Sequence, residues 1–158
     1  MDFYKLLAII SPFLSAGLTS FITYMVTMKG KRFDLLHQSK IPAFKELSAS
    51  LIAYKNYCLG QVAIYQGNEF SPYDGDGGGT LHHRTEIARV ASFNAIYFSK
   101  QTRDSIDELL NTMSGLCNAE LYLAAGQEMG DLSESYFGMF ERTDKCIDKL
   151  YRELNFKA

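Results

Sequence analysis

The chain begins with a long uncharged segment. Residues 6–28, LLAIISPFLSAGLTSFITYMVTM, contain no charged side chain, and a cluster of basic residues follows directly. As a helix that rises about 1.5 Å per residue, this segment measures roughly 35 Å, which is enough to cross a hydrocarbon layer of about 30 Å. We therefore expect residues 1–29 to form a single transmembrane anchor and residues 30–158 to form one further domain.

A cleaved secretory signal is the alternative interpretation of this segment. A short apolar core at residues 6–14, followed by the small residues Ser15, Ala16 and Gly17, fits such a signal loosely. The apolar run nevertheless continues to Met28. A retained anchor explains the whole run, whereas a signal explains only its first half.

The positive residues that flank the segment predict its orientation. Lys29, Lys31 and Arg32 follow it, whereas Lys5 alone precedes it. Because positively charged flanks stay on the cytoplasmic side, we expect the N-terminus outside a bacterial-type inner membrane and the C-terminal domain in the cytoplasm. The three basic residues that follow are also candidates for contact with anionic lipid headgroups. The three cysteines have no CxxC spacing, which agrees with a reducing compartment.

Hydroxyl side chains recur at every fourth position of the predicted anchor. This Ser/Thr stripe consists of Ser11, Ser15, Thr19, Thr23 and Thr27. Small and hydroxyl side chains let membrane helices approach closely, so the stripe predicts lateral association. The alternative is that each hydroxyl only bonds to the carbonyl one turn earlier in its own helix.

The rest of the chain has the apolar periodicity of helices and no convincing strand pattern. Four helical stretches are expected, at residues 33–66, 80–98, 99–126 and 131–155. Because the last helices are joined by short connections, they are expected to be antiparallel neighbours. The expected fold class is therefore all-α, with an N-terminal transmembrane helix followed by an antiparallel bundle of about four helices.

Individual residues predict where these helices start, bend and end. We expect Pro42 to kink or restart the first helix, because proline lacks the backbone donor of the helical hydrogen bond. Ser99 or Thr102 is expected to cap the third helix, and Asp131 with Glu134 to open the last.

The segment between the first two of these helices is rich in Gly and Asp. Residues 67–83, GNEFSPYDGDGGGTLHH, predict a flexible loop. Asp74 and Asp76 have the spacing of the first two ligands of a calcium loop, but Gly78 and Thr85 stand where that loop needs an oxygen ligand and a bidentate glutamate. We therefore do not expect calcium binding here.

A weak metal-site candidate lies where this loop meets the second helix. His82, His83 and Glu86 have a spacing that lets one histidine share a helix face with the carboxylate. A zinc site needs three or four ligands, and the others would have to come from the loop. The alternative is a polar helix start with exposed histidines, and we expect no cofactor.

The overall charge limits the class of function. A net charge of −2 and a pI near 5.9 argue against nucleic-acid binding, and no catalytic motif is present. We expect a non-enzymatic interaction or oligomerisation module held at the lipid bilayer, with a second copy or a membrane or cytoplasmic protein as partner. One alternative is a small membrane-perturbing effector of a stress or defence system, in which the Ser/Thr stripe lines a polar path. A second alternative is a membrane-tethered metal-dependent enzyme built around His82, His83 and Glu86.

Overall fold

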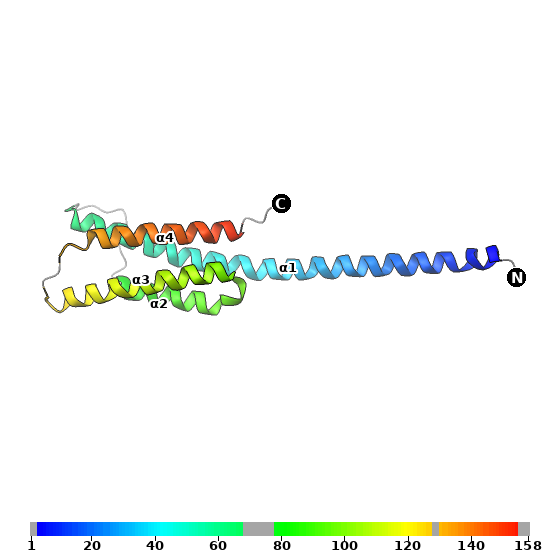
Figure 1. Ribbon diagram of the computed structural model, residues 1–158, viewed down its shortest axis with the longest axis horizontal. Helices are drawn as coiled ribbons and strands as arrows, with labels where there is room; N and C mark the ends of the chain where they lie inside the picture. Colours follow the sequence, from blue (N-terminus) through cyan, green and yellow to red (C-terminus); the bar gives the residue numbers. More distant parts are fainter. Residues whose placement is uncertain (1–2, 68–77, 128–129, 155–158) are drawn as a thin grey trace. The chain divides into compact units, whose positions relative to one another are not determined.

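The computed structural model describes residues 3–67, 78–127 and 130–154; the side chains of 3–14, 32, 33 and 35–37 are also outside the description. The described residues form four α-helices and one short 3₁₀ helix (Figure 1). Their bounds are α1 Phe3–Tyr65, α2 Gly79–Phe93, η1 Ala95–Tyr97, α3 Lys100–Ala124 and α4 Ser133–Leu154. The all-α prediction is confirmed.

The chain divides into two units, Met1–Lys40 and Ile41–Ala158. In the first unit the large apolar side chains from Leu18 to Val26 are exposed, with 65% of the surface accessible at both of these residues. Within the part of the chain that the structure describes, no helix is both long and apolar enough to cross a membrane. Residues 6–14, the first part of the predicted anchor, lie outside the described side chains, and the anchor stays a prediction.

The second unit is a four-helix bundle in which consecutive helices run in opposite directions (Figure 1). Contacts between α1 and α4 show that these two helices are also antiparallel: Ser48 of α1 meets Tyr151 of α4, and Lys55, about two turns further along α1, meets Asp144. The helices bury one apolar face each, as the spacing of three and four residues predicts. The most fully buried large side chains are Phe44, Leu47, Leu51, Tyr54, Ile87, Ile106, Met113 and Leu150.

Helix α1 passes through Pro42 without a break, so the predicted restart there is wrong, whereas the kink stays a prediction. Proline fixes φ near the helical value and costs one backbone hydrogen bond. The adjacent Ala43 and Phe44 are buried, with only 3% and 0% of their surfaces exposed. Packing of these neighbours in the core stabilises the helical path and offsets the lost bond.

Helix α2 starts earlier and ends earlier than the sequence predicts. Residues 79–83 belong to the helix and not to the loop, because Gly79 turns the chain with a φ of 64° and α2 starts there. At the other end, the Asn94 side chain donates to the Val90 carbonyl at 3.1 Å. The chain then continues as η1 rather than as helix to Phe98.

The predicted ends of α3 are confirmed. The Ser99 hydroxyl accepts a hydrogen bond from the Thr102 backbone N–H, and Gly126 follows the helix with a φ of 76°. Before α4, which starts at Ser133, the Asp131 carboxylate accepts from the Ser133 backbone N–H at 2.7 Å, as expected of a capping residue, whereas the part expected of Glu134 stays a prediction.

Candidate functional site

The three residues of the predicted metal site are all on α2, and the rings of His82 and His83 lie 5.6 Å apart, but the three side chains have different surroundings. His83 is buried, with its ring 5.0 Å from that of Tyr57. His82 is exposed, and Glu86 forms an ion pair with Arg89 at 2.7 Å. The hydrogen bonds from Arg89, together with its charge, lower the pKa of Glu86. Each of the three side chains thus faces a different environment.

Among the described residues, no group of three or more His, Cys, Asp or Glu side chains comes close enough to hold a metal ion. Asp74 and Asp76 of the calcium-like sequence lie outside the described residues. His82, His83 and Glu86 therefore stay a sequence hypothesis that acquires no further ligand in the described part of the chain.

The Ser/Thr stripe is partly described. The Thr19 hydroxyl donates to the Ser15 carbonyl at 2.8 Å, which is the bond within one helix that the alternative interpretation expects. Thr23 and Thr27 are exposed, and the side chain of Ser11 lies outside the description.

The basic residues after the predicted anchor are likewise described in part. Lys29 and Lys31 are exposed, whereas the side chain of Arg32 lies outside the description. Exposure leaves the two lysines accessible to an anionic surface.

A carboxylate links all four helices of the bundle at the end where α2 starts. Glu120 of α3 accepts hydrogen bonds from the hydroxyls of Tyr57 on α1 at 3.1 Å and Tyr136 on α4 at 2.8 Å. It also accepts from Thr80 of α2, through the hydroxyl and through the backbone N–H at 2.9 Å. We call these four residues the Glu120 cluster.

The cluster satisfies the start of α2 electrostatically as well as through hydrogen bonds. The first backbone N–H groups of a helix have no partner within that helix and carry a partial positive charge. A carboxylate that accepts the Thr80 N–H meets both needs. Gly79 is part of the same arrangement, since a Cβ atom there would lie 3.2 Å from Glu120 Oε2.

The tyrosines of the cluster are held in their neutral, hydrogen-bond-donating form. Burial, followed by the charge of Glu120, raises the pKa of Tyr57 to about 12. Burial, followed by the hydrogen bond to Glu120, also raises the pKa of Tyr136. With four donors converging on one carboxylate, the arrangement is suited to joining helices.

The thiols of the bundle are poor nucleophiles. Cys58, Cys117 and Cys146 are buried and free. Burial raises the pKa of Cys58 to about 12 and that of Cys146 to about 11, and it also raises the pKa of Cys117. Because the thiolate is the reactive form, these shifts oppose nucleophilic use.

The position of Glu120 in the sequence could have indicated that its carboxylate is engaged inside the bundle, although helical periodicity alone did not single it out. Met113, Cys117 and Glu120 follow at helical spacing, so the glutamate continues the apolar stripe of α3. A charged residue at a core position usually has a buried partner. The sequence does not say which of the ten tyrosines supply it.

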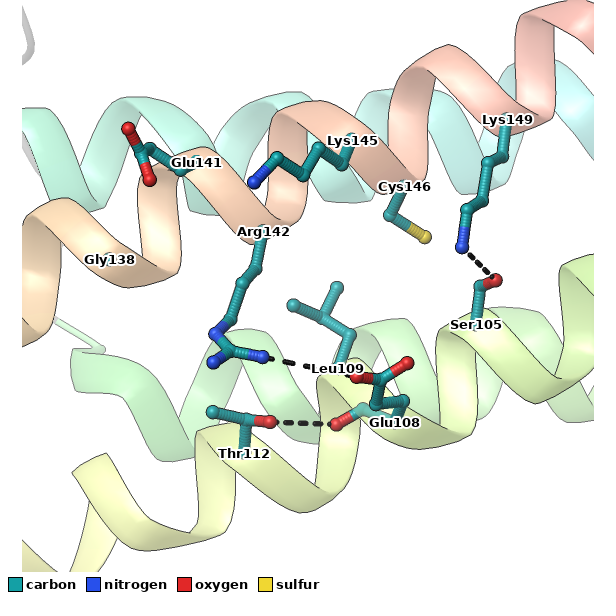
Figure 2. Close-up of a pocket in the computed structure, with 10 residues that line it drawn as sticks. All are labelled: Ser105, Glu108, Leu109, Thr112, Gly138, Glu141, Arg142, Lys145, Cys146 and Lys149. Carbon is teal, nitrogen blue, oxygen red and sulfur yellow. Dashed lines mark hydrogen bonds and ion pairs between the residues drawn. The ribbon is translucent and has the colours of Figure 1, made fainter.

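An open groove separates the outer edges of α3 and α4 (Figure 2). Its first part has a volume of about 410 Å³, and a second part of about 360 Å³ shares Thr112, Gly138 and Arg142 with it. Arg142 reaches from α4 to Glu108 of α3 at 3.9 Å. The Lys149 ammonium donates to the Ser105 hydroxyl at 2.8 Å.

This α3–α4 groove has charged rims over an apolar floor. Figure 2 shows Cys146 between the two cross-groove contacts, on the side of α4 that faces Leu109. Both residues are buried, whereas Lys145 on the rim is exposed. Comparison with protein-family models, with curated proteins and with solved structures found no match to the chain.

Proposed function

We propose that this protein is a non-enzymatic interaction module that an N-terminal helix anchors in a membrane and that self-associates or recruits a protein partner there. The observation that carries the proposal is the exposure of the apolar side chains in the first unit. Leu18, Phe21 and Val26 are more than 60% exposed, and Ile22, Tyr24 and Met25 are exposed beside them. Apolar surface of this extent is unfavourable in water and favours a covering of lipid or of another apolar helix.

A bilayer is the covering that accounts for the whole uncharged segment. The exposed side chains continue an apolar run that begins at residue 6, and Lys29 and Lys31 follow at its end. Lipid would cover the apolar surface, while the lysines would lie at the headgroups and set a cytoplasmic location for the bundle.

The interior of the bundle supports a role in binding rather than in catalysis. The Glu120 carboxylate already accepts four hydrogen bonds, and its donors Tyr57 and Tyr136 have raised pKa values. A group engaged in this way is poorly placed to exchange protons with a substrate.

Membrane fractionation tests the anchor. We expect the full chain to stay in the pellet after alkaline carbonate extraction, and a reporter fused after Ala158 to be active on the cytoplasmic side. In a Phe21→Lys, Ile22→Lys variant, two charges in the apolar segment should release the chain into the supernatant. Release of the unsubstituted chain by carbonate would overturn the anchor.

Self-association through the Ser/Thr stripe is tested separately. Replacing Ser15 and Thr19 by Leu keeps the segment apolar but removes the small and hydroxyl side chains. We expect a smaller complex in detergent by sedimentation, because close approach of the helices is lost. An unchanged mass would show that the stripe only makes bonds within its own helix.

A further inference from the structure

We propose that the α3–α4 groove is an interface between two copies of this chain, paired side by side with their helices in parallel register about a two-fold axis. The inference deepens the proposed function and rests on it, because it names the surface through which the chain would self-associate.

Opposite charges line the two rims of the groove. The α4 rim presents three basic side chains, Arg142, Lys145 and Lys149, with one acidic side chain, Glu141. The α3 rim presents Glu108, which is 72% exposed.

Asp104 extends this acidic rim by one helical turn. It is also exposed, although Lys100 pairs with it at 2.6 Å from the preceding turn. Counting Glu134 in the second part of the groove, the α4 edge carries three basic and two acidic side chains, so its net charge is positive. The α3 edge carries Glu108 together with the Asp104–Lys100 pair, so its net charge is negative.

The level of these charges along the bundle decides how two copies fit. Contacts across the groove place Lys149 level with Ser105 and Arg142 level with Glu108. A two-fold axis parallel to the helices brings α4 of one copy over α3 of the other at the same level. The positive edge of each copy then faces the negative edge of its partner, twice in one interface.

An antiparallel pairing lacks this match. Turning the second copy end over end places α4 over α4 and α3 over α3 when the two faces meet. Like charges then oppose each other near the groove, which costs free energy and disfavours that arrangement.

The middle of the groove leaves room for close approach. Gly138 of α4 and Gly115 of α3 line it, and a Cβ atom built on either residue would meet no atom within 4 Å. Side chains of a second copy can therefore enter where the two helices have none of their own.

Charge reversal tests the interface on the full chain in detergent, with sedimentation as the measurement. Within the described part of the chain Lys145 forms no ion pair and Glu108 forms one weak contact, so neither change should disturb the fold. We expect Glu108→Lys and Lys145→Glu each to weaken the dimer by roughly tenfold or more, because like charges then meet across the interface. Both substitutions in one chain should restore it.

A steric variant gives an independent reading. In Gly138→Leu, the leucine side chain occupies the groove, where a Cβ meets no atom of the same chain within 4 Å. Leucine also has a higher helix propensity than glycine, so α4 should not be destabilised. We expect a monomer with an unchanged circular dichroism spectrum. The matched control Gly130→Leu, outside the helices, should leave the dimer intact.

The outcomes separate this inference from the proposed function. A carbonate-resistant chain whose dimer is insensitive to the changes at Glu108, Lys145 and Gly138 would overturn the interface and leave the anchor standing. A monomeric unsubstituted chain would overturn it equally. Dimer loss that the double charge exchange rescues would support it, whatever the Ser15 and Thr19 variants show.

Discussion

At each end of the bundle, a glutamate accepts hydrogen bonds from the start of a neighbouring helix. Glu120 accepts from Thr80 at the start of α2, and Glu153 accepts from the Ser99 backbone N–H at 2.9 Å, just before α3. Glu153 also accepts from the hydroxyls of Ser99 and Thr102. Both carboxylates therefore complement the positive end of a helix dipole.

The two carboxylates differ in the donors that complete their surroundings. Around Glu120 these are the buried phenols of Tyr57 and Tyr136, whereas Glu153 accepts from the hydroxyls of Ser99, which is exposed, and of Thr102, which is buried. Both glutamates are half-buried, but water can reach the exposed Ser99 at the Glu153 end, whereas Tyr57, Thr80 and Tyr136 around Glu120 are all buried. We therefore expect Glu120 to contribute more than Glu153 to the free energy of unfolding. Four measurements test this difference.

The largest effect is expected for Glu120→Ala. The change leaves two phenols, one hydroxyl and one backbone N–H without their acceptor, and each unsatisfied buried group costs about 1–3 kcal/mol. We expect the free energy of unfolding to fall by about 3–5 kcal/mol, measured by denaturant titration with circular dichroism. A fall no larger than that of the matching change at Glu153 would remove the distinction between the two ends.

Alkaline pH should weaken the Glu120 cluster through its phenols, and the buried thiols Cys58 and Cys146, whose pKa values are also raised, should add to the loss of stability. The pKa of Tyr57 rises from 10.0 to about 12 on folding, so the folded chain holds this proton more tightly than the unfolded chain. The contribution of Tyr57 to stability is therefore complete below pH 10 and falls as the pH rises from 10 to 12, by about 3 kcal/mol.

Tyr57→Phe is the control for this pH dependence. The variant lacks the titrating group and should lose stability less steeply over the same range. Serine and threonine at the Glu153 end do not titrate there, so an equally steep fall in the variant would assign the pH dependence elsewhere.

Glu153→Ala should have an intermediate effect. It removes a cap from α3 at a partly exposed position, where water substitutes for the lost acceptor, and we expect a loss of about 1–2 kcal/mol. Glu153→Gln keeps one acceptor oxygen and should recover most of the loss. Amide exchange at Ser99 and Thr102 would report whether the start of α3 frays.

The smallest effect is expected at two glycines with positive φ. Gly79→Ala and Gly126→Ala each place a Cβ on a left-handed backbone, at a cost of about 1 kcal/mol. Only at Gly79 does the Cβ also meet Glu120, at 3.2 Å, whereas Gly126 has open space. The variant at Gly79 should therefore melt at the lower temperature, and equal melting temperatures would show that Glu120 yields freely.

Periodicity predicted the helices because each bundle helix buries one face. The ends of α3 and the start of α4 could be predicted from Ser99, Gly126 and Asp131, because a capping residue acts on backbone groups only a few residues away. The restart at Pro42 was predicted wrongly, because the local loss of one hydrogen bond is outweighed by the packing of Ala43 and Phe44, which only the fold reveals.

The polar sites depended on partners distant in sequence. Glu120 meets Tyr57, which is far from it along the chain, and helical spacing gives a face but not what packs against it. The same limit applies to His83, whose predicted metal-binding role rested on Glu86, although its ring lies beside Tyr57. Likewise, the contact of Lys149 with Ser105 across the α3–α4 groove depends on how α3 and α4 pack against each other.

The buried thiols have a practical consequence for labelling chemistry. Since Cys58, Cys117 and Cys146 are shielded and have raised pKa values, maleimide or spin-label reagents should react slowly with the folded chain. A cysteine placed on an exposed rim, for example at Lys145, would react much faster. Fluorescence or spin-distance measurements can then be made at chosen positions with the native cysteines retained, so that the packing of the core is left undisturbed.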